Sequence, residues 1–252
     1  MMKVSRRIRM RRQARNHMII ISTLVAFAIL FTCFGIYVND CYRADTAAID
    51  AYVPEVNIEE RELKGGAVAY IPDECIAGVI FYPGGKVEAA AYVPLMRALA
   101  KEGILAVLVE MPFNLAVLKK TAANGIKDQL FWVDNWYMAG HSLGGSMAAD
   151  YAADNKDDYK GVILLGAYSS KNLSNSGLKV ASIYGSLDTV MNKKNYVGSM
   201  GNLPADLTET IIEGGNHSGF GMYGLQEGDT EATITGVAQI EETARLIAEF
   251  VK

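Results

Sequence analysis

The chain has 252 residues, of which 50% are hydrophobic and 21% are charged, which excludes an intrinsically disordered chain. Its 24 glycines show no period of three and its cysteines number three, which excludes a collagen and a disulfide-dense mini-protein. Residues 1–17 hold seven basic and no acidic residues, so the rest of the chain has a net charge of −11, which argues against nucleic acid as a partner.

An uncharged, apolar segment follows this basic tail and runs from residue 18 to residue 38. About 20 apolar residues cross the hydrocarbon core of a bilayer, and basic residues mark the cytoplasmic side. We expect a single-pass signal anchor with a cytoplasmic N-terminus and an extracytoplasmic body. A cleaved signal peptide is the alternative, although its apolar region is usually only about 7–15 residues long. A buried core helix is a third interpretation.

Residues 39–55 are polar and alanine-rich, and we expect them to form a stalk before a domain of residues 56–252. Cys33 lies within the expected span. Cys41 and Cys75 lie outside it, where they can pair or remain free thiols. The chain has no CxxC, no HExxH and only three histidines, so we expect no metal and no cofactor.

Strand and helix patterns alternate from about Asn57 onward. Apolar, β-branched runs predict strands over 67–71, 76–82, 104–109, 136–139, 162–165, 180–184 and 207–212. Helices are expected over 87–102, 143–153 and 234–251, with mixed loop and helix over 111–130. This order predicts an α/β fold with a doubly wound, mostly parallel sheet, which binds ligands at the carboxyl ends of its strands.

The loop after the strand at residue 136 carries G-x-S-x-G, with Ser142 at its centre. The motif occurs between a strand and a helix, where a tight turn needs small neighbours and exposes the serine. The helix N-terminus that follows supplies N–H groups and positive partial charge for an oxyanion. Ser142 is therefore the candidate nucleophile.

A serine needs a base to act as a nucleophile, and the chain offers three histidines. His17 lies in the basic tail, and His141 is expected to point away from its neighbour Ser142. His217, in the glycine-rich loop after the last strand, is the candidate base.

Asp188 follows the strand over 180–184 and is the candidate carboxylate that fixes the imidazole tautomer. Asp206 precedes a strand and Glu213 precedes the histidine turn, so both are weaker candidates. The order nucleophile, acid, base along the chain differs from those of chymotrypsin and subtilisin.

An oxyanion hole needs two N–H donors. One is expected from Leu143, which follows the nucleophile. The other is expected from the loop after an early strand, at Gly85 or, as the alternative, at Lys86.

Four ordered motifs now point to a family: residues 82–85, 140–145, 184–188 and 214–224. With them the chain resembles the α/β-hydrolase superfamily, in particular a small bacterial group related to dienelactone hydrolases, over about residues 67–251. The resemblance implies a Ser-His-Asp hydrolase of esters or thioesters. Dienelactone hydrolases proper use a cysteine nucleophile, so Ser142 puts a dienelactone substrate in doubt.

Only residues 166–179 separate the strand after the nucleophile helix from the strand before Asp188, which is too short for a cap domain. We expect an open site, and its candidate substrate-binding residues are Phe113, Leu115, Phe220 and Tyr223. Core packing is the alternative for Leu115 and for Val117. Residues 226–229 either contact substrate or form a solvated loop.

The sequence thus predicts a membrane-anchored, extracytoplasmic serine hydrolase that cleaves a small-molecule or envelope carboxylic ester. An acyltransferase or deacylase acting on cell-envelope glycan or lipid is an alternative. A catalytically silent scaffold is another, although Ser142, Asp188 and His217 are all retained. The oligomeric state is left open.

Overall fold

The computed structural model describes residues 2–252, without Met1 and the side chains of residues 2–9 and 11. Five of the seven basic side chains of the predicted tail therefore fall outside the described ones. The chain forms two compact units, Met1–Cys41 and Tyr42–Lys252.

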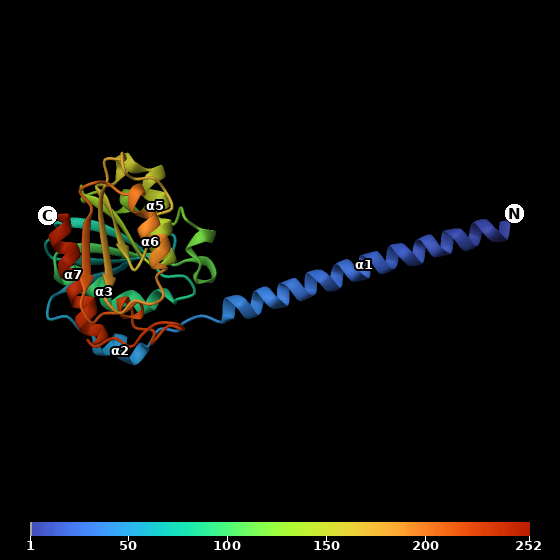
Figure 1. The fold of residues 1–252 in the computed structure, drawn as a ribbon, viewed down its shortest axis with the longest axis horizontal. Coiled ribbons are helices and arrows are strands. Elements are labelled where there is room, and N and C mark those ends of the chain that lie inside the picture. The colour runs from blue at the N-terminus through green and yellow to red at the C-terminus, as the bar shows by residue number, and fades with distance from the viewer. Residues whose placement is uncertain (1) are drawn as a thin grey trace. The chain divides into compact units, whose positions relative to one another are not determined.

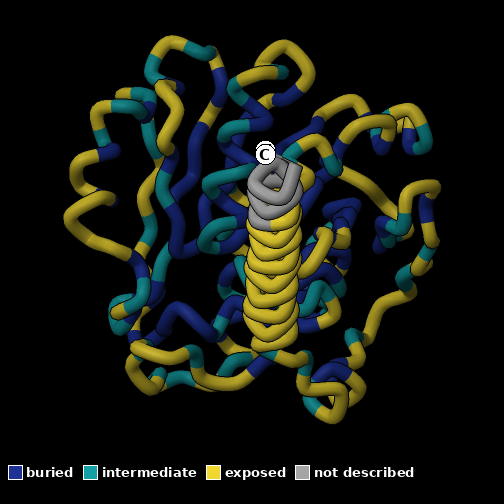
Figure 2. Tube along the Cα trace, turned by 90° about the vertical axis from the view of Figure 1, so that its right-hand side faces the viewer, coloured by how far each residue is buried: buried dark blue, intermediate teal, exposed yellow. Residues whose placement is uncertain are grey.

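The first unit is a single helix, α1 (Met2–Asn39). Its part from Arg12 to Asn39 is long and apolar enough to cross a membrane. Figure 2 shows nearly all of its described residues as exposed and none as buried, unlike those of a helix in a protein core. A signal sequence near the N-terminus also meets this criterion of length and composition.

The second unit contains an eight-stranded sheet in the order β1-β2-β4-β3-β5-β6-β7-β8. Strands β3 to β8 pair in parallel, whereas β2 is antiparallel to both β1 and β4. The strands are β1 (Ile58–Glu62), β2 (Val68–Pro72), β3 (Ala77–Tyr82), β4 (Ile104–Leu108), β5 (Trp136–His141), β6 (Gly161–Leu165), β7 (Lys179–Gly185) and β8 (Thr208–Ile212). The mostly parallel sheet predicted from the sequence is confirmed.

Helices cover both faces of the sheet (Figure 1). They are α2 (Thr46–Ala51), α3 (Val93–Lys101), α4 (Ile126–Gln129), α5 (Leu143–Asp154), α6 (Lys193–Ser199) and α7 (Gly236–Val251). Val79 and Phe81 of β3 face one core with α3 and α7, and Ile80 and Tyr82 face the other with α5. This alternation buries β3 on both faces and explains its continuous apolar run.

Two elements differ from the expected pattern. The helix expected from residue 87 begins as a 3-10 turn, Ala89–Tyr92, and becomes α3 only at Val93. Strand β1 was not expected, because its sequence IEERE lacks a regular apolar alternation. It lies at the edge of the sheet, where one side faces solvent and charged residues are tolerated.

Residues 42–55, expected as most of a stalk, lie inside the second unit and include α2. Ile49 and Tyr52 are buried, and Arg97 Nη1 donates to the carbonyl oxygens of both. Short polar segments carry no periodic signal, so this packing was not readable from the sequence. Cys33, Cys41 and Cys75 are free thiols in the described structure.

Candidate active site

The turn between β5 and α5 holds Ser142 in a backbone conformation that side chains rarely adopt, with φ 52° and ψ −123°. Such a conformation costs roughly 1–3 kcal/mol and persists where neighbouring structure enforces it. Ser142 N–H donates to Leu165 O at 2.9 Å, which ties the turn to the end of β6. A Cβ atom on Gly144 would lie 2.2 Å from the backbone oxygens of Tyr82 and Pro83, so α5 can approach β3 only with glycine there.

Backbone strain is concentrated at the carboxyl edge of the sheet. Among the described residues, the non-glycine positions with positive φ are Lys86, Phe113, Asn114 and Ser142. They follow the carboxyl ends of β3, β4 and β5. Strained residues cluster at functional sites, so this distribution marks the same edge as the motif does.

The two candidate oxyanion donors lie next to each other. A Cβ atom on Gly85 would lie 2.9 Å from Leu143 Cδ2, so the loop after β3 touches the start of α5. Leu143 is the first residue of α5, where N–H groups have no acceptor within the helix. The N–H of Lys86 donates to Asn114 O at 2.8 Å, which removes the alternative donor.

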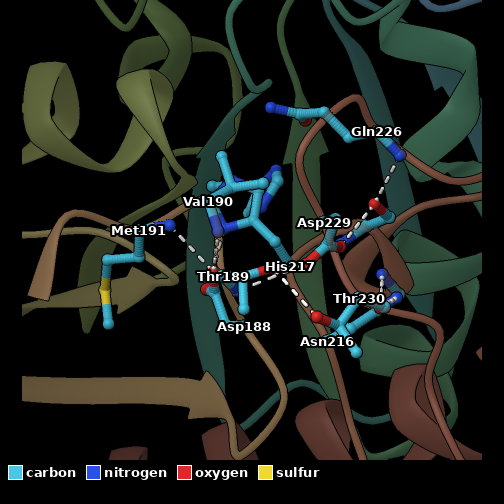
Figure 3. Close-up of polar contacts among 12 residues, drawn as sticks. Asp188, Thr189, Val190, Met191, Asn216, His217, Gln226, Asp229 and Thr230 are labelled. Atoms are coloured by element: carbon cyan, nitrogen blue, oxygen red, sulfur yellow. Dashed lines mark hydrogen bonds and ion pairs between the residues drawn. The ribbon is translucent and has the colours of Figure 1, made fainter.

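Asp188 and His217 form a buried pair (Figure 3), with 0% and 1% of their surfaces exposed. His217 Nδ1 and Asp188 Oδ2 are 2.8 Å apart. Asp188 Oδ1 accepts from the N–H groups of Val190 and Met191 at 3.0 and 2.8 Å. A carboxylate only accepts hydrogen bonds, so His217 Nδ1 carries the proton and Nε2 is left as the basic atom.

His217 Nε2 is buried and has no hydrogen-bond partner in the described structure. Its ring lies near the nucleophile turn on two sides. The rings of His217 and His141 are 4.4 Å apart, and a Cβ atom on Gly166 would lie 2.9 Å from His217 Nδ1. His141 precedes Ser142, and Gly166 follows the residue that accepts from Ser142 N–H. No hydrogen bond joins Ser142 Oγ to His217 among the described contacts.

The two weaker candidates for the acid, Glu213 and Asp206, make no described contact with His217. Glu213 is exposed and accepts from Ser186 Oγ at 3.2 Å. Asp206 is exposed and precedes β8, at the amino edge of the sheet. Asp188 is therefore the predicted carboxylate that the structure brings to His217.

His141 is fully buried and does not point to solvent. Its Nδ1 lies 2.8 Å from the hydroxyl of Tyr92, which itself accepts from Gly84 N–H at 3.1 Å. The hydroxyl of Tyr92 thus joins the loop after β3 to the ring of His141. Burial, and then the neighbouring His217, lower the pKa of His141 well below its usual value, so its ring is neutral near pH 7.

Asp229 links the acid turn to the base turn, a role that the sequence did not reveal. Its Oδ2 accepts from the N–H and the hydroxyl of Ser218, at 2.8 and 2.7 Å. Its Oδ1 accepts from Thr189 N–H at 3.4 Å, and Thr189 Oγ1 donates to Gly228 O at 2.8 Å. Thr189 and Ser218 directly follow Asp188 and His217 in the chain.

Helix α7 also supports the loop that carries His217, through hydrogen bonds from Gln239 to the backbone of Asn216. Gln239, fully buried, accepts from Asn216 N–H at 3.0 Å and donates to Asn216 O at 2.8 Å. Asn216 Nδ2 also donates to Thr230 O at 2.7 Å. The residue before His217 is therefore held at its backbone N–H, its carbonyl oxygen and its side-chain amide. A polar residue within an amphipathic helix was the available signal in the sequence.

Two of the expected substrate-binding residues, Phe220 and Tyr223, are buried in the core instead. Phe220 is fully buried with its ring 5.4 Å from that of His141, and Tyr223 is also in the core. Aromatic residues just after a catalytic loop look the same in sequence whether they face substrate or the core. Phe113 is 54% exposed and Leu115 is half-buried, so both remain accessible. No group of three metal-ligating side chains is present in the described part of the chain.

The comparisons with known proteins agree with this architecture. The model of the alpha/beta hydrolase family matches residues 78–241, and the chain belongs to this family. No curated protein matches the chain.

Solved structures of other proteins share the fold, and two of them have named sources. One is a predicted CIB-like hydrolase from Thermoplasma acidophilum, 15% identical with a TM-score of 0.54, covering 77% of this chain and 98% of its own. The other is TT1662 from Thermus thermophilus, 14% identical with a TM-score of 0.57, covering 78% of this chain and 99% of its own. At these identities the similarity concerns the fold.

Proposed function

We propose that the protein is a serine hydrolase that cleaves a carboxylic ester or thioester through an acyl-enzyme, with Ser142, His217 and Asp188 as nucleophile, base and acid. The observation that carries the proposal is the buried, 2.8 Å contact between Asp188 and His217 beside the strained turn at Ser142. Burial strengthens such a hydrogen bond and holds the imidazole in one tautomer.

The reaction follows from these positions. His217 Nε2 takes the Ser142 proton as Oγ bonds to the acyl carbon, and the N–H groups of Leu143 and Gly85 stabilise the oxyanion. The bond to the leaving group breaks as His217 returns the proton to it. Water, deprotonated by His217, then hydrolyses the acyl-enzyme. Phe113 and Leu115 are the proposed apolar wall of the site.

We also propose membership of a dienelactone-hydrolase-like group that carries a serine nucleophile, which the resemblance at the four sequence motifs supports. We also propose that α1 is a signal anchor with a cytoplasmic N-terminus. The basic residues before the apolar segment support this orientation.

The test is labelling of the full chain in detergent with a fluorophosphonate probe, which reacts with activated serines. We expect Ser142→Ala to abolish labelling, and His217→Ala and Asp188→Asn to lower it by at least about 10³-fold. Ser170→Ala, His17→Ala and Asp206→Asn are matched controls, because these side chains are exposed and make no described contact with the pair. A folded wild-type chain that does not label would refute the proposal and favour the silent scaffold.

A further inference from the structure

The hydrolase unit begins with residues 42–45, here called the entry segment, which are bonded to the loop after β3. Tyr42 N–H donates to Lys86 O at 2.7 Å, and Glu88 N–H donates to Tyr42 O at 3.1 Å. The Glu88 carboxylate accepts from Ala44 N–H at 2.9 Å and pairs with Arg43 at 2.6 Å. These contacts hold the entry segment against the loop that carries the candidate oxyanion donor Gly85.

The entry segment also touches the loop after the base. Tyr42 Oη accepts from Glu227 N–H at 3.1 Å, and Asp45 N–H donates to Met222 O at 2.8 Å. The rings of Tyr42 and Tyr223 are 5.7 Å apart. The chain therefore enters the hydrolase unit between the oxyanion loop and the histidine loop, at the catalytic edge of the sheet.

The connection between α1 and the entry segment is short. Helix α1 ends at Asn39, and only Asp40 and Cys41 lie between it and Tyr42. Three residue steps span at most about 11 Å when fully extended. If α1 crosses a bilayer, the covalent connection requires the membrane surface to begin close to the catalytic edge.

Exposed apolar side chains occur on the same edge. Val117 and Leu118 are each 52% exposed, in the 3-10 turn Ala116–Leu118 that follows β4. This region is attached to the oxyanion loop through Lys86 N–H and Asn114 O. The cationic Lys119, also exposed, follows directly, as is common where protein meets lipid headgroups.

We propose that the catalytic edge of the hydrolase unit faces the phospholipid bilayer crossed by α1, and that the substrate is an ester carried by a membrane-resident amphiphile. The inference rests on the proposed function. In this arrangement the acyl carbon reaches Ser142 from the bilayer side, and residues 117–118 rest on the lipid surface.

The first test lengthens the connection. A flexible Gly/Ser insert of 30 residues between Asp40 and Cys41 has an end-to-end distance of about 30 Å and frees the edge to turn away. The full chain, in phospholipid vesicles, is assayed on a fluorogenic ester attached to a phospholipid and on the water-soluble acetyl ester of the same fluorophore. The same insert after Lys252 is the matched control.

We expect the insert at Asp40 to lower hydrolysis of the lipid-borne ester by roughly tenfold, because the effective concentration of oriented substrate falls. Hydrolysis of the soluble ester should stay unchanged, and the control should lose neither activity. An unchanged ratio of the two activities would overturn the inference. If wild type hydrolyses neither ester, the proposed function fails instead.

A second measurement needs no activity and reads the orientation directly. A fluorophore is placed at one of two positions. The first is Cys75, which is exposed just before β3 at the amino edge, in a background without Cys33 and Cys41. The second is Leu118→Cys in a background without the three native cysteines. Bromine-labelled phospholipids should quench the probe at position 118 and not the probe at position 75. Equal quenching, or quenching at position 75 alone, would contradict the proposed orientation.

Discussion

The two halves of the candidate site are built in different ways. The nucleophile turn is local: β5, Ser142 and α5 are continuous in the chain, and glycine lets α5 approach β3. The acid–base pair joins residues from two separate loops, and its neighbours are held by Asp229 and Gln239. Substitutions in the nucleophile turn should therefore act mainly through backbone clashes. Substitutions around the acid–base pair should act mainly through the loss of polar contacts.

The largest effect is expected from Gly144→Val. The new side chain would begin 2.2 Å from the backbone oxygens of Tyr82 and Pro83, which cannot yield without moving β3. We expect a loss of more than about 3 kcal/mol in the free energy of unfolding, measured by denaturant unfolding in detergent. Gly198→Val is the control, because nothing lies within 4 Å of that position. Similar stability of the two variants would contradict the close approach.

The next effect is expected from Asp229→Ala, which removes the link between Thr189 and Ser218. We expect kcat to fall by roughly 10–100-fold with little change in KM, because the geometry of the reacting groups loosens while the substrate wall is intact. Asp229→Asn should lower kcat by a smaller factor, because the remaining amide oxygen still accepts a hydrogen bond.

Glu227→Ala is the matched control on the same loop, because the Glu227 side chain is exposed and the loop is held there by backbone N–H. The dependence of kcat/KM on pH should shift for Asp229→Ala and not for the control. A profile that coincides with that of wild type would reduce Asp229 to a structural role.

A smaller effect separates strain from chemistry at Ser142. Both Ser142→Ala and Ser142→Gly remove the nucleophile, but only glycine adopts φ 52° without strain. We expect the glycine variant to be about 1 kcal/mol more stable than the alanine variant, after the greater freedom of its unfolded chain is included. Thermal unfolding of the two variants measures this, and a more stable alanine variant would show that the turn is relaxed.

The smallest effect concerns the pH dependence of stability through His141. Its pKa is lowered in the folded state, so below the unfolded value of about 6.5 the unfolded chain binds a proton that the folded chain does not. Stability is therefore lost as the pH falls, by at most about 1 kcal/mol between pH 6.5 and 5.5 from this group. His141→Gln should flatten the decline between pH 6.5 and 5.5, whereas His17→Gln should leave it unchanged. Parallel declines would mean that His141 titrates normally.

Much of the fold was predictable because burial imposes a recognisable pattern of apolar residues on the sequence. Strands β3, β4 and β6 are buried along their whole length and appear as apolar runs, and the 3.6-residue pattern of α7 marked its core-facing side. Strand β1 and helix α2 leave no such record, because one is a charged edge strand and the other a short segment packed by a few contacts.

By itself, the sequence determined the parallel sheet, the strand–turn–helix at Ser142 and the short list of residues able to act as acid and base. Each follows from local rules: apolar periodicity, small residues at a tight turn, and the scarcity of histidines. Tertiary structure decided the rest, namely that Asp188 meets His217, that Asp229 links their turns, and that Phe220 and Tyr223 fill the core. These facts depend on contacts between residues far apart in the chain, for which side-chain type alone sets no partner.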